Sequence, residues 1–249
     1  MELRDYFEKN PHVALAFSGG VDSAYLLYAA NRHAKSLRAY YVKSAFQPQL
    51  ELEDAMRMAE QLGVELKILP LDLLEDSAIT ANVSNRCYFC KRKIFSTILE
   101  AAQKDGFTLI IDGTNASDEA EDRPGMKALQ EFSIASPLRL CGLGKDEIRR
   151  RSKEAGLFTW NKPAYSCLAT RIPHGETITE EKLKKTERAE AYLTTLGFSD
   201  FRLRLLGSSA KLQLPTSQLK QALEMRDVIV KELRKDYSAV LLDLEARDE

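Results

Sequence analysis

The sequence predicts an α/β protein in which a doubly wound parallel sheet is followed by a small α+β domain. Over the first two thirds of the chain, short apolar or alternating runs typical of strands alternate with runs of helical spacing. This alternation is typical of a parallel sheet with helices on both faces. After Gly175 the order changes to helix, two strands, helix and strand. We therefore expect one domain over residues 1–175 and a second over 176–249.

The first strand is predicted at 13–17 and leads into Ser18-Gly19-Gly20-Val21-Asp22-Ser23, after which helical spacing begins. A strand, a glycine turn and a helix start aim backbone N–H groups at an anion, and the helix dipole adds to the attraction. The two glycines let the backbone close around a phosphate. Because the Asp22 carboxylate would repel a bare phosphate, we interpret it as a magnesium ligand or a positioning group.

The later strands of the first domain are predicted at 37–42, 64–69 and 108–111, and its helices at 51–62, 91–103 and 145–155. Ligands of such sheets bind at the carboxyl ends of the strands, so residues 18–23, 43–44 and 113–115 are expected along one edge. In the second domain we expect helices at 179–196 and 217–235 and strands at 201–206, 211–214 and 239–242.

The amino-acid composition and net charge limit the classes of protein to which the chain can belong. The chain has 249 residues, of which 44% are hydrophobic and 29% charged, as in ordinary globular proteins. Lys and Arg number 36 against 37 Asp and Glu, a net charge of −1 that does not indicate a nucleic-acid partner. No apolar run is long enough for a membrane span or a signal peptide. We expect a soluble, cytoplasmic protein with reduced cysteines.

Cys87 and Cys90 form a CxxC pair. Such a pair can be a redox couple, half of a zinc site or two ligands of an iron–sulfur cluster. Tyr88 and Phe89 between them argue against the thioredoxin type, and no second CxxC or spaced His pair completes a zinc site. Three cysteines that leave one iron corner open fit a cluster better, and two cysteines at a buried helix start are the structural alternative.

Cys167 lies in a long, proline-containing loop with Lys162 and Arg171 nearby. Positive charge favours the thiolate, so Cys167 is a candidate nucleophile or metal ligand. The remaining cysteine, Cys141, lacks such neighbours and is expected to be simply buried.

Two charged segments are further candidates. Arg202 and Arg204 stand two residues apart on a predicted strand and so share a face, which suits a phosphate or a carboxylate. The alternative is a solvated sheet face, or a salt bridge with Glu187 or Glu190 on the preceding helix. The acidic segment 118–122 could help to hold magnesium, although acidic loops are usually just solvated.

The first loop resembles the SGGxDS signature of the PP-loop ATP pyrophosphatases, whose fold is of the adenine nucleotide alpha hydrolase type. It lacks the Gly-Lys-Ser/Thr of a Walker loop and the three spaced glycines of a Rossmann fingerprint. The resemblance implies that the loop holds the pyrophosphate of ATP while a substrate oxygen attacks the α-phosphorus and becomes an adenylate.

Nearly the whole chain is similar to the LarE family of ATP-dependent sulfur transferases, which help to build the nickel-pincer nucleotide cofactor of lactate racemase. The motifs that carry the likeness appear in the expected order: Ser18–Ser23, Arg86-Cys87-Tyr88-Phe89-Cys90-Lys91, Asp112-Gly113-Thr114-Asn115, Asp122-Arg123-Pro124-Gly125, Ser136-Pro137-Leu138, Trp160-Asn161-Lys162-Pro163, Cys167 to Gly175 and Phe201-Arg202-Leu203-Arg204.

This resemblance implies adenylation of a carboxylate of pyridinium-3,5-biscarboxylic acid mononucleotide, release of pyrophosphate, and displacement of AMP by sulfur to give a thiocarboxylate. It implies catalytic roles for Asp22 and Cys167, and magnesium at Asp22. The implied ATP contacts come from Ser18, Gly19, Gly20, Asp22, Ser23, Lys43, Gly113, Thr114, Lys162 and Arg171. The implied substrate-phosphate contacts come from Glu190, Arg202 and Arg204 in the small domain.

Two branches of the family differ in the source of sulfur. In one, the cysteine at the position of Cys167 gives up its own sulfur; in the other, three cysteines hold a 4Fe-4S cluster whose open corner carries sulfide. Cys87, Cys90 and Cys167 match the second branch. The expected partners are a nucleotide substrate, sulfide or another sulfur donor, and further copies of the chain in a homo-oligomer. Leu205 departs from the family pattern, which has a His there, and leaves a related substrate open.

Three other functions compete with this one. An amide-forming PP-loop synthetase of the NAD synthetase type needs ammonia and would have no use for the three cysteines. A tRNA thiolase could use the same cysteine chemistry but would be expected to show a basic surface or an added RNA-binding domain. A nucleotide-binding sensor or assembly subunit would keep the loop without turnover.

Overall fold

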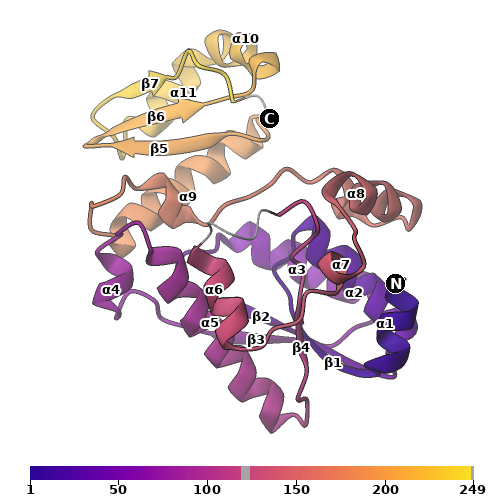
Figure 1. Ribbon diagram of the computed structural model, residues 1–249. Helices are drawn as coiled ribbons and strands as arrows, with labels where there is room; N and C mark the ends of the chain where they lie inside the picture. The colour runs from indigo at the N-terminus through magenta and orange to yellow at the C-terminus, as the bar shows by residue number, and fades with distance from the viewer. Residues whose placement is uncertain (119–123, 248–249) are drawn as a thin grey trace. The chain divides into compact units, whose positions relative to one another are not determined.

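The computed structural model describes residues 1–118 and 124–247, which divide into two compact units (Figure 1). The first unit comprises Met1–Leu73 and Asn85–Lys162, and the second comprises Leu74–Ser84 and Pro163–Glu249. The division falls before the loop that carries Cys167, whereas the sequence placed the boundary after that loop, at Gly175.

A four-stranded parallel sheet in the order β3-β2-β1-β4 forms the centre of the first unit. The strands are β1 (His12–Ala16), β2 (Ser36–Lys43), β3 (Leu66–Pro70) and β4 (Ile110–Asp112). The chain runs outward from β1 to β3 and then returns to the other side of β1, so the strand order reverses beside β1. This confirms the predicted α/β class and doubly wound sheet, and it puts the topological switch point at the end of β1.

Helices cover both faces of this sheet (Figure 1). One apolar layer gathers residues of α1 (Leu3–Lys9), α2 (Val21–His33), α3 (Gln49–Leu62), α7 (Pro137–Leu140) and α8 (Lys145–Glu154). The opposite layer gathers residues of α5 (Arg86–Lys104) and α6 (Pro124–Glu131). Successive strand residues point to opposite faces, so Tyr40 packs in the α5 layer and its neighbour Tyr41 in the α2 and α3 layer.

In the second unit, a three-stranded sheet in the order β5-β6-β7 packs with helices. Its elements are α4 (Ser77–Thr80), the 3₁₀ turn η2 (Leu168–Arg171), α9 (Glu180–Thr195), β5 (Arg202–Leu206), β6 (Ser209–Gln213), α10 (Thr216–Glu224), α11 (Arg226–Leu233) and β7 (Val240–Leu242). The 3₁₀ turn η1 (Phe158–Asn161) closes the first unit. The predicted α+β character of this part of the chain is confirmed.

The single helix predicted at 217–235 is wrong, because the helix breaks at Met225 into α10 and α11. Met225 has φ −98° and ψ 10°, outside helical geometry. Ala222, Ile229 and Leu233 remain buried on both sides of the break. The apolar spacing therefore continues through it, which is why the sequence reads as one helix.

Residues 74–84 belong to the second unit because they pair with the loop after η2. The Asn82 side-chain amide donates to the carbonyl oxygens of Ile172 (3.2 Å) and Pro173 (2.7 Å). In turn, the Gly175 amide donates to the Asn82 carbonyl at 3.0 Å. Asn82 is fully buried with φ 53°, a conformation that asparagine tolerates better than most residues.

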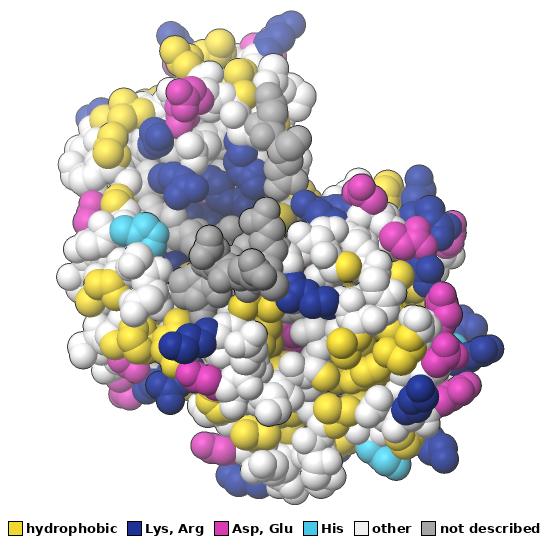
Figure 2. All heavy atoms as spheres, viewed as in Figure 1, with side chains coloured by type: hydrophobic (Ala, Val, Ile, Leu, Met, Phe, Trp, Pro, Cys, Tyr) yellow, Lys and Arg dark blue, Asp and Glu magenta, His cyan; other side chains and the backbone are white. Residues whose placement is uncertain are grey.

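Both signs of charged side chain are spread over the visible face, with apolar side chains between them (Figure 2). Among the described residues, no helix is both long and apolar enough to cross a membrane.

Candidate active site

The turn between β1 and α2 has the geometry of an anion-binding loop. Gly19 has φ 75°, which glycine adopts without strain, and Gly20 is the N-cap of α2. The Ser18 and Ser23 hydroxyl oxygens lie 3.0 Å apart, and the Ser23 hydroxyl donates to the Gly20 carbonyl at 3.2 Å. The unpaired N–H groups at the start of α2 and the positive end of its dipole favour an anion here.

This loop opens onto a cavity of about 340 Å³, within the size range of small-molecule sites. Polar groups from the ends of β1 and β4 line one part, and apolar side chains of α5 line another. The lining residues are Ala16, Phe17, Ser18, Gly20, Asp22, Ser23, Tyr41, Val42, Gln47, Lys91, Ile94, Phe95, Ile98, Asp112, Gly113, Thr114 and Asp118. A phosphate chain suits the polar end and a flat base suits the apolar end.

Asp22 lines the cavity, and only one of its two carboxylate oxygens has a hydrogen-bond partner among the described residues. Its Oδ2 accepts from the Asn115 amide at 3.2 Å, whereas its Oδ1 is buried and has no hydrogen-bond partner among the described residues. Burial raises the pKa of Asp22, Asn115 lowers it, and the Asp118 charge raises it again. A buried carboxylate oxygen without a partner, beside a second carboxylate, fits a hard cation such as Mg²⁺.

Gly113, at the end of β4, packs directly on the first turn of α2. A Cβ at this position would lie 2.8 Å from the Ser23 amide nitrogen and 3.0 Å from its Cα. Next to it, the buried Asp112 carboxylate accepts from the hydroxyls of Thr114 (2.5 Å) and Ser136 (2.6 Å). Only glycine fits at 113, and the hydroxyls hold the strand end against the loop.

Several residues expected to contact ATP are not among those that line this cavity. Gly19, Lys43 and Lys162 are not among the residues that line the cavity. Lys43 donates to the Gln47 carbonyl, and Lys162 forms ion pairs with Glu51 and Asp54. Arg171 belongs to the second unit.

The cavity also contains residues to which sequence reasoning gave no role. They are Tyr41, Gln47, Lys91, Ile94, Phe95, Ile98 and Asp112. The apolar spacing of α5 was a usable signal for Ile94, Phe95 and Ile98, since a helix between two strands of a doubly wound fold packs its apolar side on a face of the sheet. Of the acidic segment 118–122, only Asp118 lies within the described residues.

The cysteines lie in both units, and all four are thiols rather than disulfides. Cys87 and Cys90 are one turn apart at the start of α5, with Cys87 exposed and Cys90 half-buried. Cys167 begins η2 in the second unit. Among the described residues, no three His, Cys, Asp or Glu side chains gather into a metal site. Cys141 packs against the first core, where burial raises its pKa.

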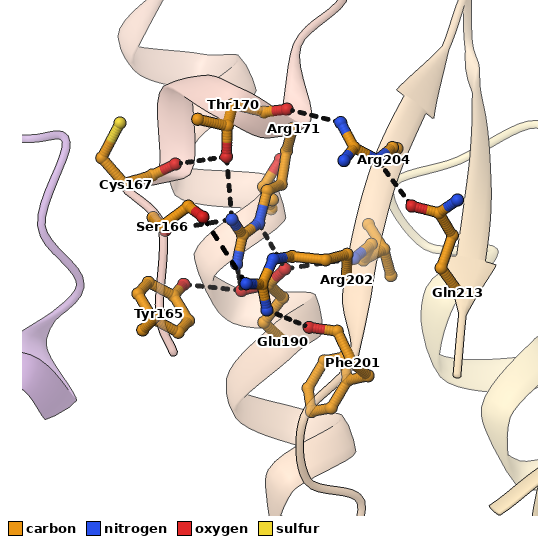
Figure 3. Close-up of polar contacts among 12 residues, drawn as sticks. Tyr165, Ser166, Cys167, Thr170, Arg171, Glu190, Phe201, Arg202, Arg204 and Gln213 are labelled. Carbon is orange, nitrogen blue, oxygen red and sulfur yellow. Dashed lines mark hydrogen bonds and ion pairs between the residues drawn. The ribbon is translucent and has the colours of Figure 1, made fainter. Parts of the chain in front are cut away.

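The second unit contains a network built on a buried ion pair (Figure 3). The Arg171 side chain is inaccessible to solvent and its Nε donates to Glu190 Oε1 at 2.8 Å. The Tyr165 hydroxyl donates to the other Glu190 oxygen at 2.6 Å, and the Leu203 amide donates to Oε1 at 3.1 Å. Burial lowers the pKa of Arg171, but the bonds with Glu190 outweigh it and the net shift is upward.

Arg202 lies beside this pair, and no carboxylate of the described residues pairs with it. It is 6% exposed and donates to the carbonyl oxygens of Phe201 (3.0 Å) and Ala164 (2.7 Å). Burial, followed by the charge of Arg171, lowers the pKa of Arg202 to about 10. Arg204 is exposed and donates to the Thr170 carbonyl (3.0 Å) and to Gln213 (2.6 Å). An additional anion would compensate the charge of Arg202.

Comparison with known proteins gives three findings. Residues 12–101 match the family described as queuosine biosynthesis protein QueC. The chain is 36% identical to an uncharacterized protein of Synechocystis sp. over 98% of its own length and 92% of the relative. It is also 32% identical to the pyridinium-3,5-bisthiocarboxylic acid mononucleotide synthase of Lactiplantibacillus plantarum, over 93% of its length and 85% of that protein.

A different type of relative matches over a shorter range. The tRNA-specific 2-thiouridylase MnmA of Thermotoga petrophila is 26% identical over 60% of this chain and 54% of its own length.

We expect Asp22→Asn to raise the melting temperature of the nucleotide- and metal-free protein while abolishing pyrophosphate release. The raised pKa means that the folded state binds the Asp22 proton more tightly than the unfolded state does. Stability is therefore lost as pH rises from the ordinary aspartate value through the raised one, and the full cost is present at pH 7. An unsatisfied buried group lowers the free energy of unfolding by about 1 kcal/mol. Removing it should therefore raise the melting temperature by about 2–4 °C.

Thermal unfolding at pH 7 measures this effect, with Asp227→Asn as the control, because the Asp227 side chain is 88% exposed. The control substitution should change neither the melting temperature nor the release of pyrophosphate. A lower melting temperature for Asp22→Asn would contradict the inference that the Asp22 charge is uncompensated in the folded protein.

Proposed function

The chain belongs to the LarE family of PP-loop enzymes, and on that premise we propose that it replaces carboxylate oxygen by sulfur on pyridinium-3,5-biscarboxylic acid mononucleotide. As a member of this family it is an ATP-dependent sulfur-inserting enzyme. The observation that carries the proposal is the loop at 18–23, which opens onto a cavity lined by polar groups from the ends of β1 and β4 and by apolar side chains of α5. We propose that the polar groups take the phosphates of ATP and the apolar side chains its base.

The first step is adenylation of the substrate. A carboxylate oxygen attacks the α-phosphorus of ATP, the bond to the β-phosphate breaks, and pyrophosphate leaves into the N–H groups at the start of α2. The Asp22 carboxylate, whose Oδ1 has no partner among the described residues, would hold a magnesium ion, and that ion would offset the charge of the phosphates. Lys91, which lines the same cavity, adds a positive charge. A sulfur nucleophile then attacks the acyl carbon and AMP leaves, giving the thiocarboxylate.

The second unit supplies the contacts to the substrate phosphate. Arg202 carries a buried positive charge with no carboxylate partner among the described residues, and Arg204, two residues along the same strand face, is exposed. Glu190 orients the neighbouring Arg171 and so shapes this site without neutralising Arg202. Two guanidinium groups suit the bidentate recognition of a phosphate.

The extent of the similarity favours this function over tRNA thiolation. The LarE-type relative matches 93% of the chain, which includes the second unit, whereas the thiouridylase matches 60%. The second unit is where the proposed phosphate contacts lie.

For the sulfur source, we propose that Cys87, Cys90 and Cys167 hold a 4Fe-4S cluster. Thiolates are the ligands that such clusters take, and the i, i+3 spacing of Cys87 and Cys90 puts two of them on one side of α5. A cluster with three protein ligands supplies an open iron for sulfide and permits repeated turnover. Sulfide as donor and assembly of the chain into a homo-oligomer belong to the same proposal.

Anaerobic reconstitution with iron and sulfide should give a brown protein with broad visible absorbance and about four irons per chain. Serine at any of the three positions should abolish this absorbance, because three ligands are the minimum for the proposed site. Cys141→Ser is the matched control and should retain the colour.

A colourless, iron-free protein after reconstitution would rule out the cluster. The sulfur would then come from Cys167 itself. In that case the intact mass after one turnover should fall by the elements of hydrogen sulfide at this residue.

Arg202→Ala should weaken binding of the pyridinium mononucleotide by about tenfold to a hundredfold, the effect of losing a charge-assisted hydrogen bond, and leave ATP binding unchanged. Calorimetric titration of each ligand measures both constants. Arg226→Ala, an exposed position in the same unit, is the control. Equal loss of both affinities would refute the assignment of the substrate phosphate to the second unit.

A further inference from the structure

An ion cluster of one lysine and two carboxylates lies against the phosphate loop. Glu51 and Asp54 stand three residues apart near the start of α3, and Lys162 reaches them from the end of the first unit. Lys162 Nζ lies 3.0 Å from Glu51 Oε1 and 2.7 Å from Asp54 Oδ2. The three side chains are 15%, 13% and 22% exposed, so water screens these charges only weakly.

The cluster touches the loop at Gly19. Lys162 Nζ lies 3.5 Å from the Gly19 carbonyl oxygen. On the same side, a Cβ on Gly19 would come within 3.3 Å of both the Ala55 Cβ and the Glu51 carbonyl oxygen. The ammonium is therefore next to the anion-binding loop, although it is held by carboxylates outside the cavity. The two carboxylates and the one ammonium give this cluster a net negative charge. That charge disfavours the binding of pyrophosphate on this side of the loop.

Tyr41 provides an independent sign that the cluster has a second arrangement. Its side chain lines the cavity, is 2% exposed, and its hydroxyl has no hydrogen-bond partner among the described residues. Burial raises the pKa of this hydroxyl and the nearby Glu51 charge raises it further. Tyr41 packs in one apolar cluster with Ala55 and Met58 of α3, the helix that carries Glu51, and a buried hydroxyl donor without a partner is an unfavourable arrangement there.

We propose that Glu51, Asp54 and Tyr41 form a two-state latch for Lys162 that responds to nucleotide. Without nucleotide, Lys162 pairs with the two carboxylates and the Tyr41 hydroxyl is unpaired. When the pyrophosphate group of ATP occupies the loop, the flexible lysine side chain moves past Gly19 onto the anion. The Tyr41 hydroxyl then donates to the Glu51 carboxylate that Lys162 has left.

Each state satisfies groups that the other leaves unpaired, which is the requirement for a two-state element. Burial raises the pKa of Glu51, so its carboxylate needs a donor once the ammonium has gone. The backbone of Lys162 is fixed meanwhile, because Arg149 donates to the carbonyl oxygens of Lys162 and Trp160, both at 3.0 Å. The side chain alone can move. Lys162 directly precedes Pro163, where the second unit begins.

The latch rests on the proposed function only in that the loop binds the pyrophosphate group of ATP. The test therefore uses magnesium pyrophosphate and the full chain, with no sulfur acceptor present, and measures affinity by calorimetry. Tyr41→Phe should weaken binding by about fivefold, the effect of one lost hydrogen bond, without lowering the melting temperature. Asp54→Asn should strengthen binding by about threefold to tenfold, since it loosens the hold on Lys162.

Two further variants make the test specific. Tyr237→Phe removes a buried hydroxyl in the second unit that has no hydrogen-bond partner among the described residues, and it should leave pyrophosphate affinity unchanged. In the Lys162→Met background, Tyr41→Phe should cause no additional loss, because the two residues act in the same step.

Wild-type affinity for Tyr41→Phe, or weaker binding for Asp54→Asn, would overturn the latch. Intact pyrophosphate binding without any sulfur insertion would contradict the proposed function and leave these affinity differences in place.

Discussion

Close contact between backbones at the carboxyl edge of the parallel sheet is the constraint on which the site depends. Gly113 leaves no room for a Cβ beside Ser23, and a Cβ on Gly19 would lie only 3.3 Å from the Ala55 Cβ and the Glu51 carbonyl oxygen of α3. Because β4 and the start of α2 meet with no side chain between them, the loop residues line the cavity and the half-buried Asp22 lies beside Asn115. A doubly wound sheet provides this edge, and the glycines allow it to close.

The same packing decides the electrostatics of both units. Within the described residues, each unit contains a charged group that is incompletely compensated: the buried Asp22 Oδ1 has no hydrogen-bond partner, and the buried Arg202 donates only to carbonyl and hydroxyl oxygens. By contrast, Arg171 and Glu190 satisfy one another and make the second unit rigid there. The two uncompensated charges have opposite signs. They are where we propose a magnesium ion and a substrate phosphate, so the unsatisfied groups mark the ligands.

The doubly wound parallel sheet and the phosphate loop were predictable because their signals are local in the sequence. These signals are the strand-like runs, the two adjacent glycines and the start of a helix. The pairing of Asn82 with Ile172 and Pro173 was not, since the partners are about ninety residues apart in the chain and no periodicity links them. The Arg171–Glu190 pair spans only 19 residues, but it was missed because no periodicity links the loop to the helix. Tyr41 has the pattern of a core strand residue, and only three-dimensional packing reveals that its hydroxyl, at a cavity wall, has no hydrogen-bond partner among the described residues.

Adenylation of a pyridinium carboxylate followed by sulfur insertion is best tested by product stoichiometry. The full chain is incubated anaerobically with ATP, Mg²⁺, sulfide and pyridinium-3,5-biscarboxylic acid mononucleotide, and the products are separated and weighed by mass spectrometry. We predict one AMP and one pyrophosphate for each oxygen replaced by sulfur. Formation of ADP and phosphate, or of AMP and pyrophosphate with no sulfur in the nucleotide, would contradict it.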